Sequence, residues 1–133
     1  MANFDFGQLT AFAVGYKPQS KAFTTANVNS DAMDTAGFEG VSVVTAVGDS
    51  NIGTNNVSVV WWESDDNTRA NATALSIDRV IVNEEINASN TTFKAAVAPT
   101  KRYLFAEFDP DAACFANIAM VATLGLSHDV PTT

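Results

Sequence analysis

Basic residues, cysteine and histidine are all scarce in this chain of 133 residues. Seven lysines and arginines stand against 15 aspartates and glutamates, which gives a formal net charge of −8. Binding to nucleic acid requires basic side chains that neutralise phosphates, and attachment to an anionic membrane surface requires them as well. The shortage of basic residues therefore argues against both classes of partner.

The single cysteine, Cys114, excludes an internal disulfide and stands in an apolar stretch, where we expect a buried and unreactive thiol. The single histidine, His128, lies far from Cys114 in the chain, so no zinc site of the usual kind and no cofactor are expected. Ser127 and Asp129 flank His128, but neighbours in the sequence do not by themselves form a catalytic triad. Glycine motifs that cradle phosphates or carry a nucleophilic serine are absent.

Long apolar runs and targeting segments are also missing. The first residues contain no basic segment followed by an apolar one, so we expect no signal peptide. The apolar run over residues 114–126 is too short to span a bilayer. Hydrophobic residues nevertheless make up 47% of the chain, which excludes general disorder and favours a single folded domain.

The chain does contain many short segments with period-two or β-branched character, separated by turn-forming residues. This pattern predicts an all-β protein, a β-sandwich or jelly-roll of about eight antiparallel strands. The expected strands are residues 9–16, 21–28, 38–47, 57–63, 74–82, 91–97, 101–108 and 115–124. We expect an N-terminal arm and first strand at 1–20, a sandwich at 21–126 and a C-terminal tail at 127–133, all in one domain.

Acidic side chains gather where two of these strands end. Glu63, Asp65 and Asp66 form one cluster, and Asp109 and Asp111 form the other. Such carboxylates could bind calcium or act as an acid–base pair, but the spacing of a calcium-binding loop is absent. Aspartate at a strand end commonly accepts hydrogen bonds from the turning backbone, and we favour this explanation.

Several expected strands carry apolar side chains on both faces. If Trp61 points into a core, then Val60 and Trp62 point outward, because successive side chains of a strand alternate. Phe105 likewise falls on the face opposite Leu104. Loops or the N-terminal arm could cover this excess, or it could form a contact with another protein, because aromatic residues are enriched there. We predict a protein contact at Val60, Trp62 and Phe105, and a second candidate contact at Phe4, Phe6 and Phe12.

Four segments together resemble the small decoration proteins, also called cement or head-stabilising proteins, of tailed bacteriophages. The segments are Asp34-Thr-Ala-Gly-Phe-Glu-Gly-Val41 with the strand that follows it to Gly48, Trp61-Trp-Glu-Ser-Asp-Asp-Asn67, Pro99-Thr-Lys-Arg-Tyr-Leu104, and Leu124-Gly-Leu-Ser-His-Asp-Val-Pro131. Their order and spacing match over roughly residues 30–131. The tryptophan pair and Phe105 depart from the family pattern, which has smaller, polar or charged residues there.

The resemblance implies a non-enzymatic sandwich or jelly-roll protein that binds the outside of an assembled phage head and bridges its subunits. It implies the major capsid protein as partner, synthesis in the host cytoplasm, and a final place on the outer surface of the virion. The oligomeric state varies within the family, and we favour a homotrimer because capsid lattices offer repeated three-fold sites that suit closed cyclic assembly. An alternative function is carbohydrate binding by a sandwich module on a virion surface, because exposed tryptophan and tyrosine also stack on sugar rings. A third hypothesis is a hydrolase that uses Asp109, Asp111 and Glu107, which would require these carboxylates to line a cleft with shifted pKa values.

Overall fold

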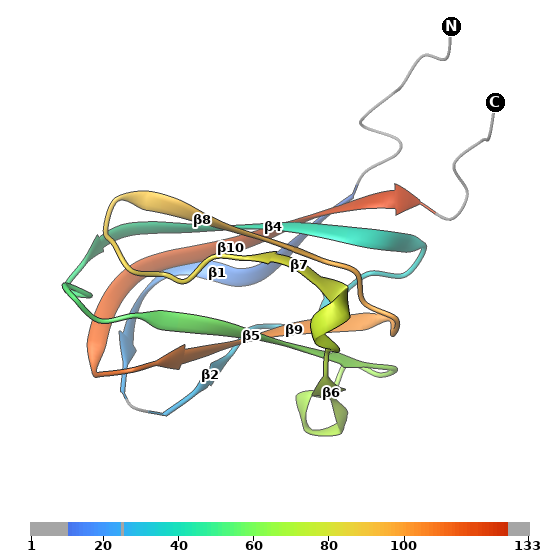
Figure 1. The fold of residues 1–133 in the computed structure, drawn as a ribbon, viewed down its shortest axis with the longest axis horizontal. Coiled ribbons are helices and arrows are strands. Elements are labelled where there is room, and N and C mark those ends of the chain that lie inside the picture. Colours follow the sequence, from blue (N-terminus) through green and yellow to red (C-terminus); the bar gives the residue numbers. More distant parts are fainter. Residues whose placement is uncertain (1–10, 25, 128–133) are drawn as a thin grey trace, which may run out of the picture.

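The computed structural model describes residues 11–24 and 26–127, and they form two antiparallel β-sheets packed face to face (Figure 1). Sheet A contains, in spatial order, β1 (Ala11–Phe23), β10 (Cys114–Ser127), β4 (Phe38–Ser50), β8 (Thr91–Val97) and β7 (Val80–Asn83). Sheet B contains β2 (Val28–Asn29), β9 (Tyr103–Pro110), β5 (Val57–Ser64) and β6 (Thr73–Ala74), and β3 (Met33–Asp34) also pairs with β9. The expected β-sandwich is confirmed, with ten strands in the described residues where about eight were expected.

Two of the expected strands share one strand in the structure. The long edge strand β1, which pairs with β10 along its length, contains residues 11–16 of the strand expected at 9–16 and residues 21–23 of the one expected at 21–28, whose last residue, Val28, begins β2. Gly15 and Pro18 fall at the two irregularities of that pairing, where an edge strand tolerates an unpaired backbone group. The boundary expected after residue 20 therefore falls within β1.

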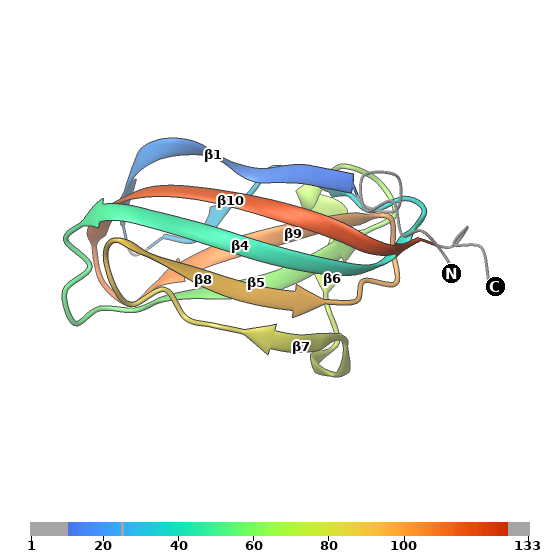
Figure 2. The same ribbon diagram turned by 90° about the horizontal axis from the view of Figure 1, so that it is seen from above.

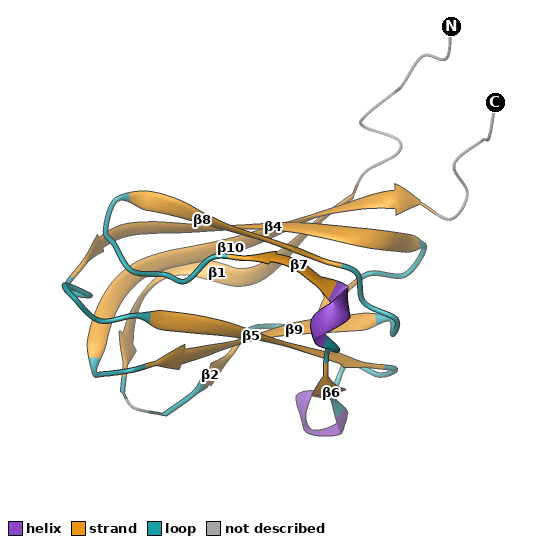
Figure 3. Ribbon diagram, viewed as in Figure 1, coloured by secondary structure: helices purple, strands orange, loops and turns teal. Residues whose placement is uncertain are grey.

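One expected strand is broken in the structure. Residues 74–82 contain the end of β6, the short 3₁₀ turn η2 (Ile77–Arg79) and the start of β7, which carry the chain from sheet B to sheet A (Figure 3). A second 3₁₀ turn, η1 (Arg69–Asn71), lies between β5 and β6. No helix in the described residues is long and apolar enough to cross a membrane.

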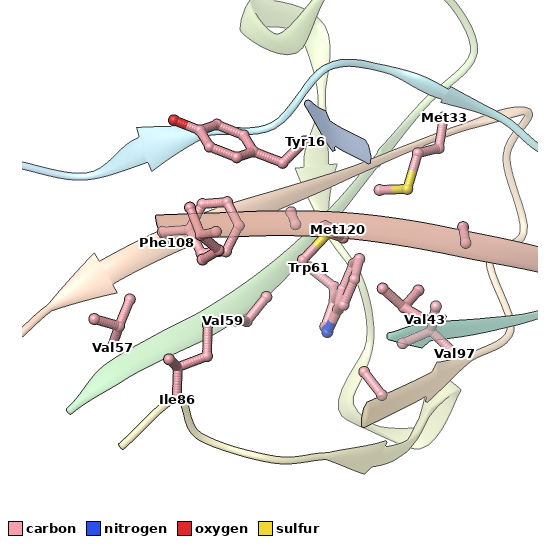
Figure 4. Close-up of a cluster of buried hydrophobic side chains, with 14 of the residues drawn as sticks. Tyr16, Met33, Val43, Val57, Val59, Trp61, Ile86, Val97, Phe108 and Met120 are labelled. Carbon is pink, nitrogen blue, oxygen red and sulfur yellow. The ribbon is translucent and has the colours of Figure 1, made fainter. Parts of the chain in front are cut away.

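Strand alternation builds the core between the sheets. In β4, Val41, Val43, Thr45 and Val47 are buried while the residues between them are exposed. Trp61 of β5 lies in the same core (Figure 4), and its Nε1–H donates a hydrogen bond to Asn83 Oδ1 at 3.2 Å. The ring of Phe108 meets that of Tyr16 edge to face, with 5.3 Å between centroids, so β1 and β9 are joined across the sandwich.

Candidate interaction surface

The outer face of sheet A carries several exposed apolar side chains. Figure 2 looks onto this face, where β1, β10, β4 and β8 lie side by side and β7 forms the edge. Strand pairing aligns its outward residues in three rows across the sheet. The rows are Phe12–Thr123–Ser42–Ala96–Val82, Val14–Val121–Val44–Lys94, and Ala119–Ala46–Thr92.

The large side chains in these rows are open to solvent. Phe12 is 72% exposed, Val14 51%, Val44 45% and Val121 41%. Val121 stands directly between Val14 and Val44, so the three valines form a continuous apolar row. Contiguous exposed apolar surface of this kind is typical of a protein-binding site.

Lys94 is the one charged residue in the three rows. A carboxylate lies near it at the edge of the sheet, where Glu84 Oε2 accepts a hydrogen bond of 2.9 Å from the backbone N–H of Lys94. The centre of the face therefore carries no carboxylate, although the chain has 15 acidic residues. We call these three rows the apolar face.

The outer face of sheet B carries the contact residues expected from the tryptophan pair. Trp61 is buried, as expected for a side chain that points inward. Its two neighbours on β5 point outward: Val60 is 37% exposed and Trp62 is half-buried. The orientation expected for all three side chains is confirmed. Whether Val60 and Trp62 contact another protein stays a prediction.

Arg69 of η1 folds back over this part of sheet B. Its guanidinium carbon lies 4.0 Å from the centroid of the Trp62 ring, which is a cation–π contact. The same guanidinium donates to Glu107 Oε2 at 2.6 Å and to Asn29 Oδ1 at 3.1 Å. The loop after β5 thus covers one face of the Trp62 ring. Cover by a loop was one of the two explanations for the outward apolar side chains, and contact with another protein was the other.

Phe105 differs from expectation, because only 2% of it is exposed. It does lie on the outer face of β9, opposite Trp62 of β5. Its neighbours in the sheet are Trp62 on one side of β9 and, on the other side, the chain around Ser30, whose N–H is bonded to the carbonyl of Ala106. Phe105 thus lies on the expected face but offers almost no exposed surface, and its part in a protein contact stays a prediction.

Of the second expected group of aromatic contact residues, the structure describes only one. Phe12 is exposed on the apolar face of sheet A, on the sheet opposite Val60 and Trp62. Phe4 and Phe6 lie outside the described residues, as does His128. The described contact residues therefore belong to two separate surfaces, one on each sheet.

The acidic cluster at the end of β5 takes part in turn and loop hydrogen bonding, as expected. The carboxylate of Glu63 is buried and accepts three hydrogen bonds: from the N–H and Oγ1–H of Thr100 and from the N–H of Lys101. Asp66 accepts from Thr68 N–H at 2.9 Å and from the Asn71 side chain at 2.9 Å. These bonds, that of Thr68 above all, hold the pKa of Asp66 below its usual value.

The second acidic cluster also contributes to loop structure. Asp111 Oδ1 accepts a hydrogen bond from the N–H of Asn56, and Asp111 N–H donates to the Asn56 carbonyl. Cys114 next to it is buried as expected, and burial raises the pKa of its thiol. Glu107 points to the outer face of sheet B and is held there by Arg69, and Asn27 donates to its other oxygen. In the described residues, no group of three or more histidine, cysteine or acidic residues has the geometry to hold a metal ion.

Comparisons with known proteins place the fold. No protein-family model matches the sequence, and none of the curated proteins matches it. Among solved structures, the crystal structure of the SPBc2 prophage-derived protein YomS is similar, with a TM-score of 0.54 and 12% sequence identity over 86% of this chain and 91% of that one. The likeness shows a shared fold.

Sequence patterns alone did not reveal the apolar face. The apolar residues on both sides of residues 115–124 were a signal, and the structure confirms that Met120 is buried while its neighbour Val121 is exposed. The contribution of Val44 was recognisable in principle, because a valine at an outward position of an alternating strand breaks the pattern. Its alignment with Val14 depends on the pairing of three strands distant in sequence, and a single sequence does not contain that register.

Proposed function

We propose that this chain is a non-enzymatic bacteriophage protein that decorates the outside of an assembled capsid and stabilises it by bridging capsid subunits. The described polar clusters are occupied by structural hydrogen bonds. The observation that carries the proposal is the exposed Val60 beside the half-buried Trp62 on the outer face of sheet B, framed by Arg69 and Glu107. A surface of this kind suits lasting contact with another protein. The prophage origin of YomS and the four sequence segments described above support a phage setting.

The physical properties of the chain suit this role. A protein that binds only the assembled shell stabilises the shell by mass action, since dissociation of the shell would require release of the bound protein. A net charge of −8 keeps the protein soluble and disfavours binding to the nucleic acid that a phage head contains. The protein would be made in the host cytoplasm, where a single buried cysteine needs no oxidising environment, and would end on the outer surface of the virion.

In this proposal the outer face of sheet B contacts the major capsid protein. Val60 is exposed there beside Trp62, and Arg69 and Glu107 surround them with polar groups. An apolar centre with a polar rim is the usual anatomy of a protein contact. The same geometry disfavours the carbohydrate alternative, because Arg69 occupies one face of the Trp62 ring on which a sugar would stack.

The experiment adds purified protein to capsids that were assembled without it, from the phage whose genome encodes the chain, and measures co-sedimentation. We expect saturable binding and a higher dissociation temperature of the capsid. Val60→Lys should weaken this binding about tenfold or more, because it places a charge in a desolvated contact. Ile77→Lys, at an 81% exposed position of η2, is the control that should bind like the wild type. Wild-type protein that stays in the supernatant at every concentration would refute the proposal.

A further inference from the structure

We propose that the apolar face of sheet A is the contact between two copies of this chain, packed face to face about a two-fold axis. This face lies on the opposite side of the sandwich from the outer face of sheet B, on which the proposed function rests. The contact between copies does not depend on attachment to a capsid, so each can fail separately.

Charge singles out this face for a second copy. Each copy carries a net charge of −8, so two copies repel one another over most orientations. The three rows of the apolar face contain no Asp or Glu among their residues, and the carboxylate of Glu84, at the edge of the sheet, is bonded to the Lys94 N–H. Two copies can therefore meet there without burying an unpaired carboxylate, which would be costly.

The extent of the face can be compared with that of a stable contact. Outward residues lie ~6.8 Å apart along a strand and strands lie ~4.8 Å apart, so the rows of five, four and three residues present roughly 400 Å². A stable protein contact buries about 800 Å² on each partner. The three rows would therefore form the centre of the contact, with neighbouring outward residues of sheet A at its margin.

The shapes of the outward side chains suit sheet-on-sheet packing. Small residues such as Ala46, Ala96 and Ala119 alternate with the larger Val44 and Val121. Two such faces, about 10 Å apart, can interdigitate as the two inner faces of a sandwich do. Lys94 and Glu84 at the edge would form part of a polar rim.

The symmetry of the contact determines the number of copies. When a surface packs against the same surface of another copy, both are used up and the assembly closes at two. A trimer, favoured above from the three-fold sites of capsid lattices, would instead require contact between two different surfaces. The pair leaves both sheet B outer faces exposed on opposite sides, so one pair could bridge two capsid subunits.

The test measures mass by sedimentation equilibrium, without capsids, up to about 100 µM protein, a range that covers the usual affinities of contacts of this size. We expect twice the chain mass of 14.1 kDa for the wild type. Val121→Lys, in the centre of the face, should give the single-chain mass or at least a tenfold weaker association, with an unchanged circular dichroism spectrum. Val60→Lys makes the same change at a similarly exposed valine on the outer face of sheet B, and it should sediment as the pair.

Three results would overturn the inference: a wild-type mass of one chain or three chains, a paired Val121→Lys variant, or loss of pairing in Val60→Lys. Should a folded Val121→Lys variant prove impossible to obtain, Val44→Lys in the same row replaces it, with the same expected result. Failure to bind capsids, with pairing intact, would count against the proposed function and not against this contact.

Discussion

Gly15 lies where two core methionines come closest to the backbone of β1. A Cβ atom at this position would lie 2.9 Å from Met33 Sδ and 3.1 Å from Met120 Sδ. Both methionines are fully buried, so neither can move aside into solvent. The residue also falls at an irregularity in the pairing of β1 with β10, so the glycine serves close packing between the sheets at the point where the strand bends.

Gly15→Ala should lower the free energy of unfolding by roughly 1–3 kcal/mol, the usual cost of adding a methyl group to a filled core. The control is Gly125→Ala in β10, where an added Cβ meets no atom within 4 Å. Urea unfolding of both variants checks the prediction. Equal stability of the two variants would show that the methionines make room without cost.

The loop after β5 makes the outer face of sheet B different from that of sheet A, because it covers part of the sheet B face. Ser64, Asp66, Thr68 and Asn71 hold it through a local network of hydrogen bonds. Because this network fixes the start of η1, it places the Arg69 guanidinium over Trp62 and next to Glu107. Sheet B therefore has a cover on its outer aromatic residues, whereas the outer face of sheet A has none among the described residues.

The loop should weaken in acid because of Asp66. Hydrogen bonds to its carboxylate lower the pKa in the folded state, so the bonds contribute stability above the unfolded value of about 4. That contribution is lost as the pH falls through the lower, folded value. Urea unfolding between about pH 5 and pH 2.5 should therefore show a smaller loss of stability for Asp66→Asn, whose side chain does not titrate, than for the wild type. Identical pH dependence of the two proteins would contradict this role of Asp66.

Period-two patterns were sufficient to predict the sheet elements and the directions of their side chains. The inward side of residues 57–63 and the burial of Leu104, Ala106 and Phe108 follow from alternation, and the structure confirms them. The burial of Phe105 could not be derived in this way. Alternation predicts which face of the sheet a side chain lies on, and it does not predict whether that face is open to solvent. The neighbours of Phe105 in the sheet, Trp62 and the chain around Ser30, come to β9 from distant positions in the sequence.

At the scale of the whole molecule, a strongly acidic chain with one acid-free apolar face has two opposing contributions to self-association. Burial of apolar surface favours the pair, and repulsion between two net charges of −8 opposes it. The repulsion acts through solvent over distances longer than the contact, so dissolved salt screens it. The apolar contribution changes little over the same range of salt.

Salt should therefore strengthen the pair. The Debye length falls from about 30 Å at 0.01 M to about 8 Å at 0.15 M ionic strength, which removes most of the repulsion between the two charged bodies. We expect the association constant from sedimentation equilibrium to rise severalfold over this range. A contact made of ion pairs would respond in the opposite direction, because salt screens their attraction as well. A constant that falls with added salt would thus place the contact on a charged surface, and not on the row of Val14, Val121 and Val44.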